Sequence, residues 1–181
     1  MKKWLFGFLL LISALSQGQS KIDFSAGVYS LTAKGSTTSS SESGFGAYQF
    51  SYRQEFLKSF EFGFNYTMIL ANGLSGDSSY GPGVLVNYYP MTLASSNYYK
   101  NGSINYISQE TYKPYIGISL SQRSYQSAQA NFGGIGVQVG NEYHIEKNYY
   151  LKTELIYLPM NGNGSMSANE TNFLIGIVFG L

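Results

Sequence analysis

The sequence predicts an all-β protein, a closed eight-stranded antiparallel up-and-down transmembrane β-barrel. Eight stretches alternate between apolar and polar residues with a period of two, which places each kind on one face of a strand. The chain holds 21 glycines, 17 tyrosines and 12 phenylalanines, and only 12% of its residues are charged. This composition favours strands over helices or disorder. The final stretch, Phe173 to Leu181, is an apolar strand that ends with the chain.

The first 18 residues have the layout of a secretory signal peptide. Lys2 and Lys3 precede an apolar run, Trp4 to Leu15, which is too short to span a bilayer comfortably and is followed by small residues suited to cleavage. We expect residues 1–18 to be removed and residues 19–181 to form one barrel domain. The chain has no cysteine, which excludes both a lipid-modified cysteine and a disulfide.

Each of the eight predicted strands carries one uncharged, apolar face. In chain order, the residues on these faces are Ile22, Phe24, Ala26 and Val28; Tyr48, Phe50 and Tyr52; Phe60, Phe62, Phe64, Tyr66, Met68 and Leu70; Tyr80, Pro82, Val84, Val86 and Tyr88; Tyr112, Pro114, Ile116, Ile118 and Leu120; Ile135, Val137, Val139 and Tyr143; Tyr149, Leu151, Leu155 and Tyr157; and Phe173, Ile175, Ile177, Phe179 and Leu181. The opposite faces hold glycine, short polar residues and the charges.

Alternation alone fits either a membrane barrel or a soluble barrel or sandwich, which would bury the apolar face. Three further observations favour the membrane. Aromatic residues gather near one end of the strands, as expected where rings meet a lipid–water boundary. The polar face is rich in glycine, which a narrow barrel interior needs. Short turns follow the second and sixth strands, whereas longer polar loops such as Gly35–Ser43 and Asn161–Thr171 follow the odd-numbered strands.

Residues 91–111 depart from this alternation, because they form a long segment where a short turn is expected. Asn101–Gly102 is a type I′ hairpin signal within this segment. We therefore expect a small hairpin that caps the rim. A ten-stranded barrel is the alternative, but each added strand would need about 9–11 residues to cross the bilayer.

The combination of signal peptide, eight alternating strands and apolar closing strand resembles the small bacterial outer-membrane barrels of the OmpA and OmpX type. Gly176, Phe179 and Leu181 resemble the glycine, aromatic and terminal hydrophobic positions of the C-terminal signal read by the barrel-assembly machinery. The chain departs from that signal because it ends in Leu and not Phe, and because Leu174 stands where a polar residue is common.

The resemblance implies a location in the outer membrane of a Gram-negative bacterium, with extracellular loops and periplasmic termini. It also implies two partners, the outer-membrane lipids and the barrel-assembly machinery. We expect a monomer. Without Lys2 and Lys3, nine Lys and Arg oppose ten Asp and Glu, a formal charge of −1, so the chain lacks the basic excess expected of a nucleic-acid partner.

If the polar face lines the lumen, hairpin geometry brings its charges together. Glu142 is expected opposite Lys152, with Glu154 one step along the same face, and Arg53 reaches Glu61 diagonally. The expected lumen network comprises Arg53, Glu61, Lys113, Glu142, His144, Lys152 and Glu154. Because an unpaired buried charge is costly, we favour a structural plug of paired charges. The alternative is a gate, in which one partner switches and a narrow pore opens.

No catalytic site, cofactor or metal site is predicted. The only histidine, His144, is expected near Lys113 at the periplasmic end of the sixth strand, whereas the outer-membrane barrel enzymes that this architecture resembles use a histidine near the outer rim. A catalytic Ser–His–acid arrangement of His144 with Glu142 or Glu154 is the least favoured alternative. One histidine without cysteine does not supply the several ligands that a zinc site needs.

The sequence therefore predicts a non-enzymatic outer-membrane barrel with a structural, scaffold or narrow-pore role. Transport of a small or lipophilic solute and surface adhesion through the loops are the alternatives, and a secreted, soluble, lipid-binding barrel is the structural rival. Pro82 and Pro114 lie within strands, where a missing N–H disturbs the ladder. Lateral openings at these prolines are conceivable, but local bulges or strand ends are the preferred interpretation.

Overall fold

The structure is a computed structural model, and it describes residues 19–35, 39–57, 59–70, 78–91, 93–101, 104–125, 130–146, 148–163 and 165–181. The predicted signal peptide, residues 1–18, lies outside these ranges and stays a prediction. No helix in the described part of the chain is long and apolar enough to cross a membrane.

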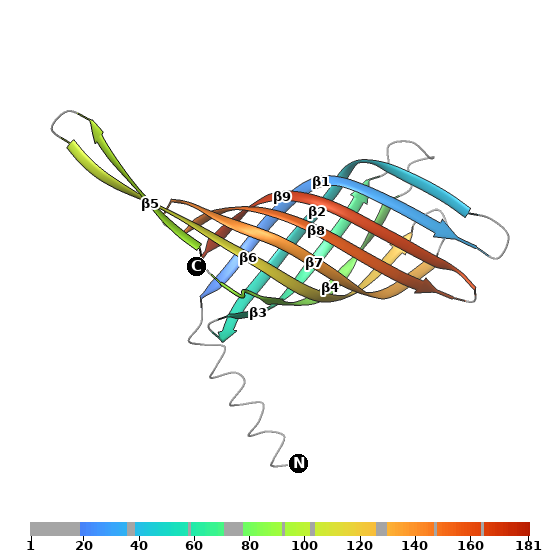
Figure 1. The fold of residues 1–181 in the computed structure, drawn as a ribbon. Helices are drawn as coiled ribbons and strands as arrows, with labels where there is room; N and C mark the ends of the chain where they lie inside the picture. The colour runs from blue at the N-terminus through green and yellow to red at the C-terminus, as the bar shows by residue number, and fades with distance from the viewer. Residues whose placement is uncertain are drawn as a thin grey trace, which may run out of the picture.

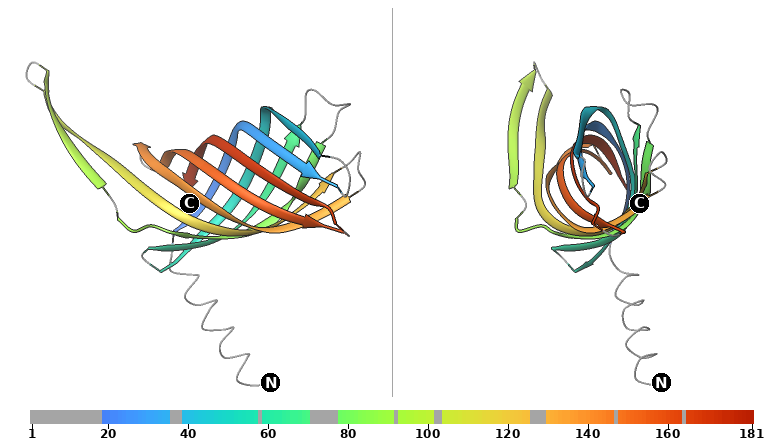
Figure 2. Two further views of the ribbon diagram at one scale, coloured as in Figure 1. Left: turned by 45° about the vertical axis from the view of Figure 1, so that its right-hand side comes forward. Right: turned by 90° about the vertical axis from the view of Figure 1, so that its right-hand side faces the viewer.

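The described residues form one antiparallel sheet. Its strands are β1 (Ser20–Lys34), β2 (Ser39–Leu57), β3 (Phe60–Leu70), β4 (Ser78–Tyr88), β5 (Leu93–Asn101), β6 (Ile104–Tyr125), β7 (Ala130–Glu146), β8 (Tyr149–Gly162) and β9 (Ser167–Gly180). The strand order runs from β4 through β1 and β9 to β6, and β4 also pairs with β6. This last pairing closes eight strands into a ring, which Figure 1 shows from the side and the right-hand view of Figure 2 shows more nearly end-on. The predicted fold class is confirmed.

The two faces of the barrel wall have the predicted polarity. On β9, the outward side chains of Phe173, Ile175 and Ile177 are 45–50% exposed, whereas the inward Leu174 and Val178 are fully buried. The same alternation holds along the other barrel strands, with apolar residues outside and most polar and charged residues inside. This arrangement is the reverse of a soluble barrel, and it suits a surrounding of lipid.

Aromatic rings form contacts around the end of the barrel that carries the short turns near Ser59 and Asn148. The ring pairs on neighbouring strands are Phe60–Tyr88, Tyr112–Tyr143 and Tyr149–Phe179, with centroids 4.8, 4.9 and 5.4 Å apart. We call this end the near end and the opposite end, where β1–β2 and β8–β9 are joined, the far end.

The strands extend further toward the far end than the sequence suggested. Most of the expected loops Gly35–Ser43 and Asn161–Thr171 is paired strand, so that expectation was wrong. The backbone ladder continues through these segments, and Ser41 in one of them is hydrogen-bonded to Thr32 on β1 at 3.0 Å. Hydroxyl residues that look like loop composition are therefore compatible with a polar strand extension.

A bulge at Gly46 explains why the period-two pattern of β2 does not continue to residues before Tyr48. The pairing with β1 shifts between Gly27 and Val28, which leaves Gly46 as the extra residue. Gly46 has a φ of 146°, and a Cβ on it would crowd the carbonyl oxygen of Leu70. The bulge switches the parity, so that Phe45 points outward with 60% exposure.

The expected hairpin in residues 91–111 is present, but it does not cap the rim. Strand β5 pairs with residues 104–112 of β6, and this arm projects away from the barrel in Figures 1 and 2. The pairing of β6 with β7 begins only at Tyr112. Strand β6 is one continuous strand of 22 residues, and residues 104–111 extend past the end of the barrel wall. The hairpin therefore continues the direction of β6 and does not fold across the barrel opening.

Candidate functional site

Most of the inward-facing charges gather in the near half of the barrel. We call this group the lumen cluster; its members are Lys21, Asp23, Arg53, Glu61, Glu142, Lys152 and Glu154. All seven residues are 3% exposed or less. They come from β1, β2, β3, β7 and β8, so three cations and four carboxylates from five strands meet inside one narrow lumen.

Arg53 is the hub of the lumen cluster. Its Nε donates to Asp23 Oδ2 at 2.9 Å, and its Nη1 donates to Glu61 Oε2 at 2.9 Å. The same Nη1 also donates to Glu142 on β7. The contact between Arg53 and Glu61 was expected from the sequence. The contacts with Asp23 and Glu142 were not, because Glu142 lies on a strand that is not a neighbour of β2.

The two lysines extend the network to both sides of this hub. Lys21 Nζ lies 2.8 Å from Glu142 Oε2 and also contacts Glu61. Lys152 Nζ lies 2.7 Å from Asp23 Oδ1 and 3.2 Å from Glu154 Oε2. Glu142 does stand opposite Lys152 in the β7–β8 register, as expected. The ammonium group of Lys152 nevertheless pairs with Glu154 on its own strand and with Asp23 on β1, because its partner on the intervening strand β9 is Gly176, which has no side chain to block the approach.

Two tyrosine hydroxyls also contact the carboxylates of the cluster. The Tyr89 hydroxyl lies 2.8 Å from Glu61 and 2.9 Å from Glu142, and the Tyr115 hydroxyl donates to Glu154 at 2.8 Å. Their rings touch, with centroids 5.3 Å apart. Sequence reasoning missed both residues. The position of Tyr115 on the polar parity of β6, one residue after Pro114, was the available signal.

Lys113 and His144 lie at the rim, and each contacts the ring of Tyr150. Lys113 Nζ is 5.1 Å from the centroid of the Tyr150 ring, and the His144 ring is 5.1 Å from the same centroid. Both residues are partly exposed, whereas the lumen cluster is buried. The structure thus places five of the seven predicted lumen residues in one cluster, and it places these two at its edge.

A second, separate ion pair lies toward the far end. Arg123 contacts Glu170 through Nε at 3.1 Å and through Nη2 at 3.2 Å, and Asn172 donates to the same carboxylate at 2.7 Å. Around it lies an apolar layer, whose buried members are Tyr125, Ala130, Phe132, Leu158, Met160 and Ala168. The sequence did not pair Arg123 because Glu170 was expected in a loop.

The lumen between these two groups is tightly filled. A Cβ on Gly176 would come within 2.1 Å of Ser25 Oγ, and one on Gly117 within 2.2 Å of Asn87 Oδ1. Polar inward residues such as Gln49 are only 1% exposed. Side chains and backbone are thus in close contact at these positions of the polar interior.

The three residues of the expected assembly signal occupy different surroundings. Gly176 faces the packed lumen, Phe179 belongs to the aromatic ring at the near end, and Leu181 is 68% exposed. The backbone N–H of Leu181 donates to Ser20 O at 2.9 Å, which ties the end of the chain to β1. Recognition of these residues by an assembly machinery stays a prediction.

Within the described ranges, no three or more His, Cys, Asp or Glu side chains are arranged so that they could hold a metal ion. No family model matches the chain, and no curated protein matches it by sequence. Solved structures do match it. Neisserial surface protein A is 13% identical with a TM-score of 0.53, and the match covers 88% of this chain and 96% of that one.

Two Pseudomonas aeruginosa structures match to a similar degree. OprG is 12% identical with a TM-score of 0.52, covering 90% of this chain and 96% of that one. The N-terminal β-barrel domain of OprF is 13% identical with a TM-score of 0.50, covering 91% and 100%. The chain has the fold of the small outer-membrane barrels. At these identities the likeness concerns the fold, so the function has to be argued from the residues of this chain.

Proposed function

We propose that this protein is an integral outer-membrane barrel with a closed lumen, which acts as a membrane scaffold and not as an open pore or an enzyme. The lumen cluster is the observation that carries the proposal. Seven charges on five strands, each 3% exposed or less, fill the near half of the interior with ion pairs. Such an arrangement both locks the strands together and leaves no open passage through that half.

The outward face supports the membrane location. Ile118, Leu120 and Ile135 are 57–66% exposed, and they belong to an apolar belt that surrounds the barrel. A soluble protein seldom exposes so large an apolar surface. The secreted, soluble, lipid-binding barrel is disfavoured for the same reason, because its apolar residues would line the inside.

The orientation and assembly follow from the topology as further parts of the proposal. Both ends of the described chain, near Ser20 and Leu181, lie at the near end with the short turns. In outer-membrane barrels the short turns face the periplasm, so the far end is assigned to the cell exterior. The β1–β9 pairing closes the sheet, which fits a monomer surrounded by outer-membrane lipids after insertion by the barrel-assembly machinery.

Electrostatics explain why a closed lumen is favoured over a gate. Arg53 contacts three carboxylates, and Lys21 contacts two of the same three. Moving one partner away would leave several buried charges unpaired, which typically costs about 3–5 kcal/mol. A gate requires two states of similar free energy, and a network shared in this way disfavours the open state.

Conductance in planar bilayers tests the closed lumen. The mature chain, residues 19–181, is folded in detergent, its folding is verified by heat-modifiable gel migration, and it is added to the bilayer at neutral pH. We expect no discrete conductance steps, because the lumen is filled from the near end to the far end. Reproducible single-channel steps from the folded form would overturn the proposal and favour the narrow-pore alternative.

Cell fractionation tests the membrane location independently. We expect heat-modifiable protein in the outer-membrane fraction. Recovery of folded protein from the soluble periplasmic fraction would refute the location whatever the conductance result.

Lateral passage of a lipophilic solute is the second candidate, because the β4–β6 pairing is interrupted at a proline. Within the described strands, this pairing passes from Tyr80–Ser124 directly to Gly83–Ser121 and skips both Gly81 and Pro82. A Tyr80→Cys/Ser124→Cys variant would form a disulfide across this seam in a chain that has no other cysteine. If solutes pass here, oxidation should block their uptake into proteoliposomes and reduction should restore it; equal uptake in both states would exclude this route.

A further inference from the structure

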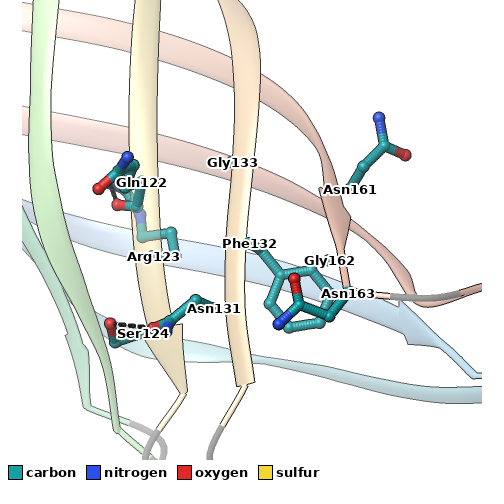
Figure 3. Close-up of a pocket in the computed structure, with 9 residues that line it drawn as sticks. All are labelled: Gln122, Arg123, Ser124, Asn131, Phe132, Gly133, Asn161, Gly162 and Asn163. Carbon is teal, nitrogen blue, oxygen red and sulfur yellow. Dashed lines mark hydrogen bonds between the residues drawn. The ribbon is translucent and has the colours of Figure 1, made fainter.

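A polar hollow lies in the barrel wall at the far end, between β6, β7 and β8. Its volume is about 430 Å³, and Figure 3 shows the residues around it. Four carboxamides, a hydroxyl and a glycine contribute to its lining: Gln122, Asn131, Asn161, Asn163, Ser124 and Gly133. Amide side chains from three strands border the hollow.

Glycine makes the space. A Cβ built on Gly133 would meet no described atom nearer than 3.9 Å, so this position is open where other glycines of the barrel are crowded. Gly162 lies against the Phe132 ring, which a Cβ there would meet at 2.8 Å. Ser124 and Asn131 are joined by a hydrogen bond of 2.7 Å along one side of the hollow (Figure 3).

The hollow begins where the apolar belt ends. On β6 and β7, Leu120 and Ile135 are cross-strand partners in the belt, and the next outward pair is Gln122 with Gly133. Successive outward pairs are about 7 Å apart along a strand. The polar hollow therefore lies directly beyond the edge of the surface that faces lipid tails.

A second, apolar groove adjoins the hollow on the membrane side. It has a volume of about 200 Å³ and is lined by outward side chains of β3, β4, β6 and β7, among them Phe62, Val84, Val86, Ile118, Leu120 and Ile135. Leu120 and Ile135 thus border the groove, and the next outward residues on the same two strands, Gln122 and Gly133, border the hollow. The two spaces share no lining residue but lie one outward residue pair apart along β6 and β7, and we call the two together the path.

We infer that this path is a binding site for one lipid with a neutral, hydroxyl-rich sugar headgroup. The acyl chain occupies the groove, and the sugar occupies the hollow. Carboxamides and hydroxyls both donate and accept hydrogen bonds, which matches the hydroxyl groups of a sugar. The one charged lining residue, Arg123, is already bound by Glu170 at 3.1 Å and is 2% exposed, so it does not attract an anionic headgroup.

This inference rests on the proposed membrane location but not on the closed lumen. A conductance result that overturns the closed lumen would therefore leave the lipid site standing, and the absence of lipid binding would leave the closed lumen standing. Lipid retention measures it directly. The protein is placed in phosphatidylcholine nanodiscs that contain digalactosyl diacylglycerol or phosphatidylglycerol as the minor lipid, is released in the mass spectrometer, and the lipids that remain bound are counted. A separate arm adds free galactose to the nanodiscs and follows the side-chain amide NMR signals of Asn131 and Asn161.

We expect the galactolipid to be retained about tenfold more than phosphatidylglycerol, as two or so additional hydrogen bonds would produce. Gly133→Leu fills the open space without a backbone clash and should abolish the preference. Asn169→Leu is the matched control, because Asn169 points outward on β9 opposite Pro159, beside β8 but outside the hollow, and it should leave the preference unchanged.

Three outcomes would overturn the inference. Equal retention of both lipids would show that the hollow selects no headgroup. A preference that survives Gly133→Leu would place the selection elsewhere on the barrel. Saturable shifts with free galactose, as strong as those with the galactolipid, would make this a site for a soluble sugar, in which the apolar groove takes no part.

Discussion

The near and far halves of the lumen hold buried charges in two different ways. In the near half, Arg53 contacts three carboxylates and each of these has a second cation or tyrosine beside it. In the far half, Arg123 and Glu170 form one bidentate pair next to an apolar layer. The first arrangement is a shared network, whereas the second is a separable pair. In the function proposed above, the interior is thus closed by ion pairs at one end and largely by apolar packing at the other.

The largest effect is expected from Arg53→Met in the near half. The substitution keeps the volume but leaves Asp23, Glu61 and Glu142 with too few cations. We expect the free energy of unfolding to fall by about 3–5 kcal/mol. Urea titration in lipid vesicles, read by far-UV circular dichroism, measures it; the only tryptophan is Trp4 in the predicted signal peptide, so tryptophan fluorescence cannot be used. A loss below about 1 kcal/mol would show that the ion pairs contribute little.

A smaller but still large effect is expected from Leu158→Ala in the far half. Leu158 is fully buried in the apolar layer, and its truncation leaves a cavity. Such changes destabilise by about 2–5 kcal/mol. Leu155→Ala on the same strand is the control, because that outward side chain is 45% exposed and faces lipid in the proposed location, so its truncation loses transfer free energy but leaves no internal cavity; Leu158→Ala should lose more. Similar losses of stability in the two variants would mean that the far layer is not a packed core.

A modest effect is expected from Tyr115→Phe. The change removes only the hydroxyl that donates to Glu154, while Lys152 still contacts this carboxylate at 3.2 Å. A hydrogen bond to a charged group contributes about 1.5–3 kcal/mol, and we expect the lower end because Glu154 keeps a partner. Tyr157→Phe, outward on β8, should have no measurable effect on the same urea titration. A Tyr115→Phe variant as stable as the wild type would remove Tyr115 from the network.

The smallest effect is expected from replacing the far pair as a whole. Arg123→Met/Glu170→Leu exchanges two paired charges for apolar side chains beside an existing apolar layer. Buried pairs replaced in this way are often neutral or stabilising, so the free energy of unfolding should stay within about 1 kcal/mol of the wild type. A loss near that of a single buried charge, about 3 kcal/mol or more, would show that the pair is needed for its other hydrogen bonds, from Arg123 to the carbonyl oxygens of Gln122 and Gly81 and from Asn172 to Glu170.

Local periodicity was enough to predict the barrel and the polarity of its wall. A register fixed by a short turn was also enough to place Glu142 opposite Lys152 and Arg53 within reach of Glu61, because those residues lie on neighbouring strands. The same reasoning could not predict contacts across the lumen. Strand tilt and barrel diameter decide which side chains of β1 or β2 contact those of β7. Neither quantity can be read from the spacing of residues in the sequence.

Two other misses have local causes. The bulge at Gly46 breaks the period of two, so the outward Phe45 fell on the unexpected parity. The composition of residues 39–43 and 167–171 predicts loops, because serine, asparagine and glycine are common both in loops and in polar strands. In the structure these residues belong to β2 and β9. As a result Glu170, the partner of Arg123, was not recognised as a lumen residue.

Rescue by a second substitution tests the central claim, that the near half is a shared network, most directly. Arg53→Met/Glu142→Leu and Arg123→Met/Glu170→Leu are compared with their single Arg→Met parents by urea titration in the same vesicles. We predict that the far double variant regains nearly all the stability lost by Arg123→Met. The near double variant should regain only a minor part, because Asp23 and Glu61 still lack Arg53. Equal and complete rescue at both ends would contradict the claim, since it would make the lumen cluster a set of independent pairs.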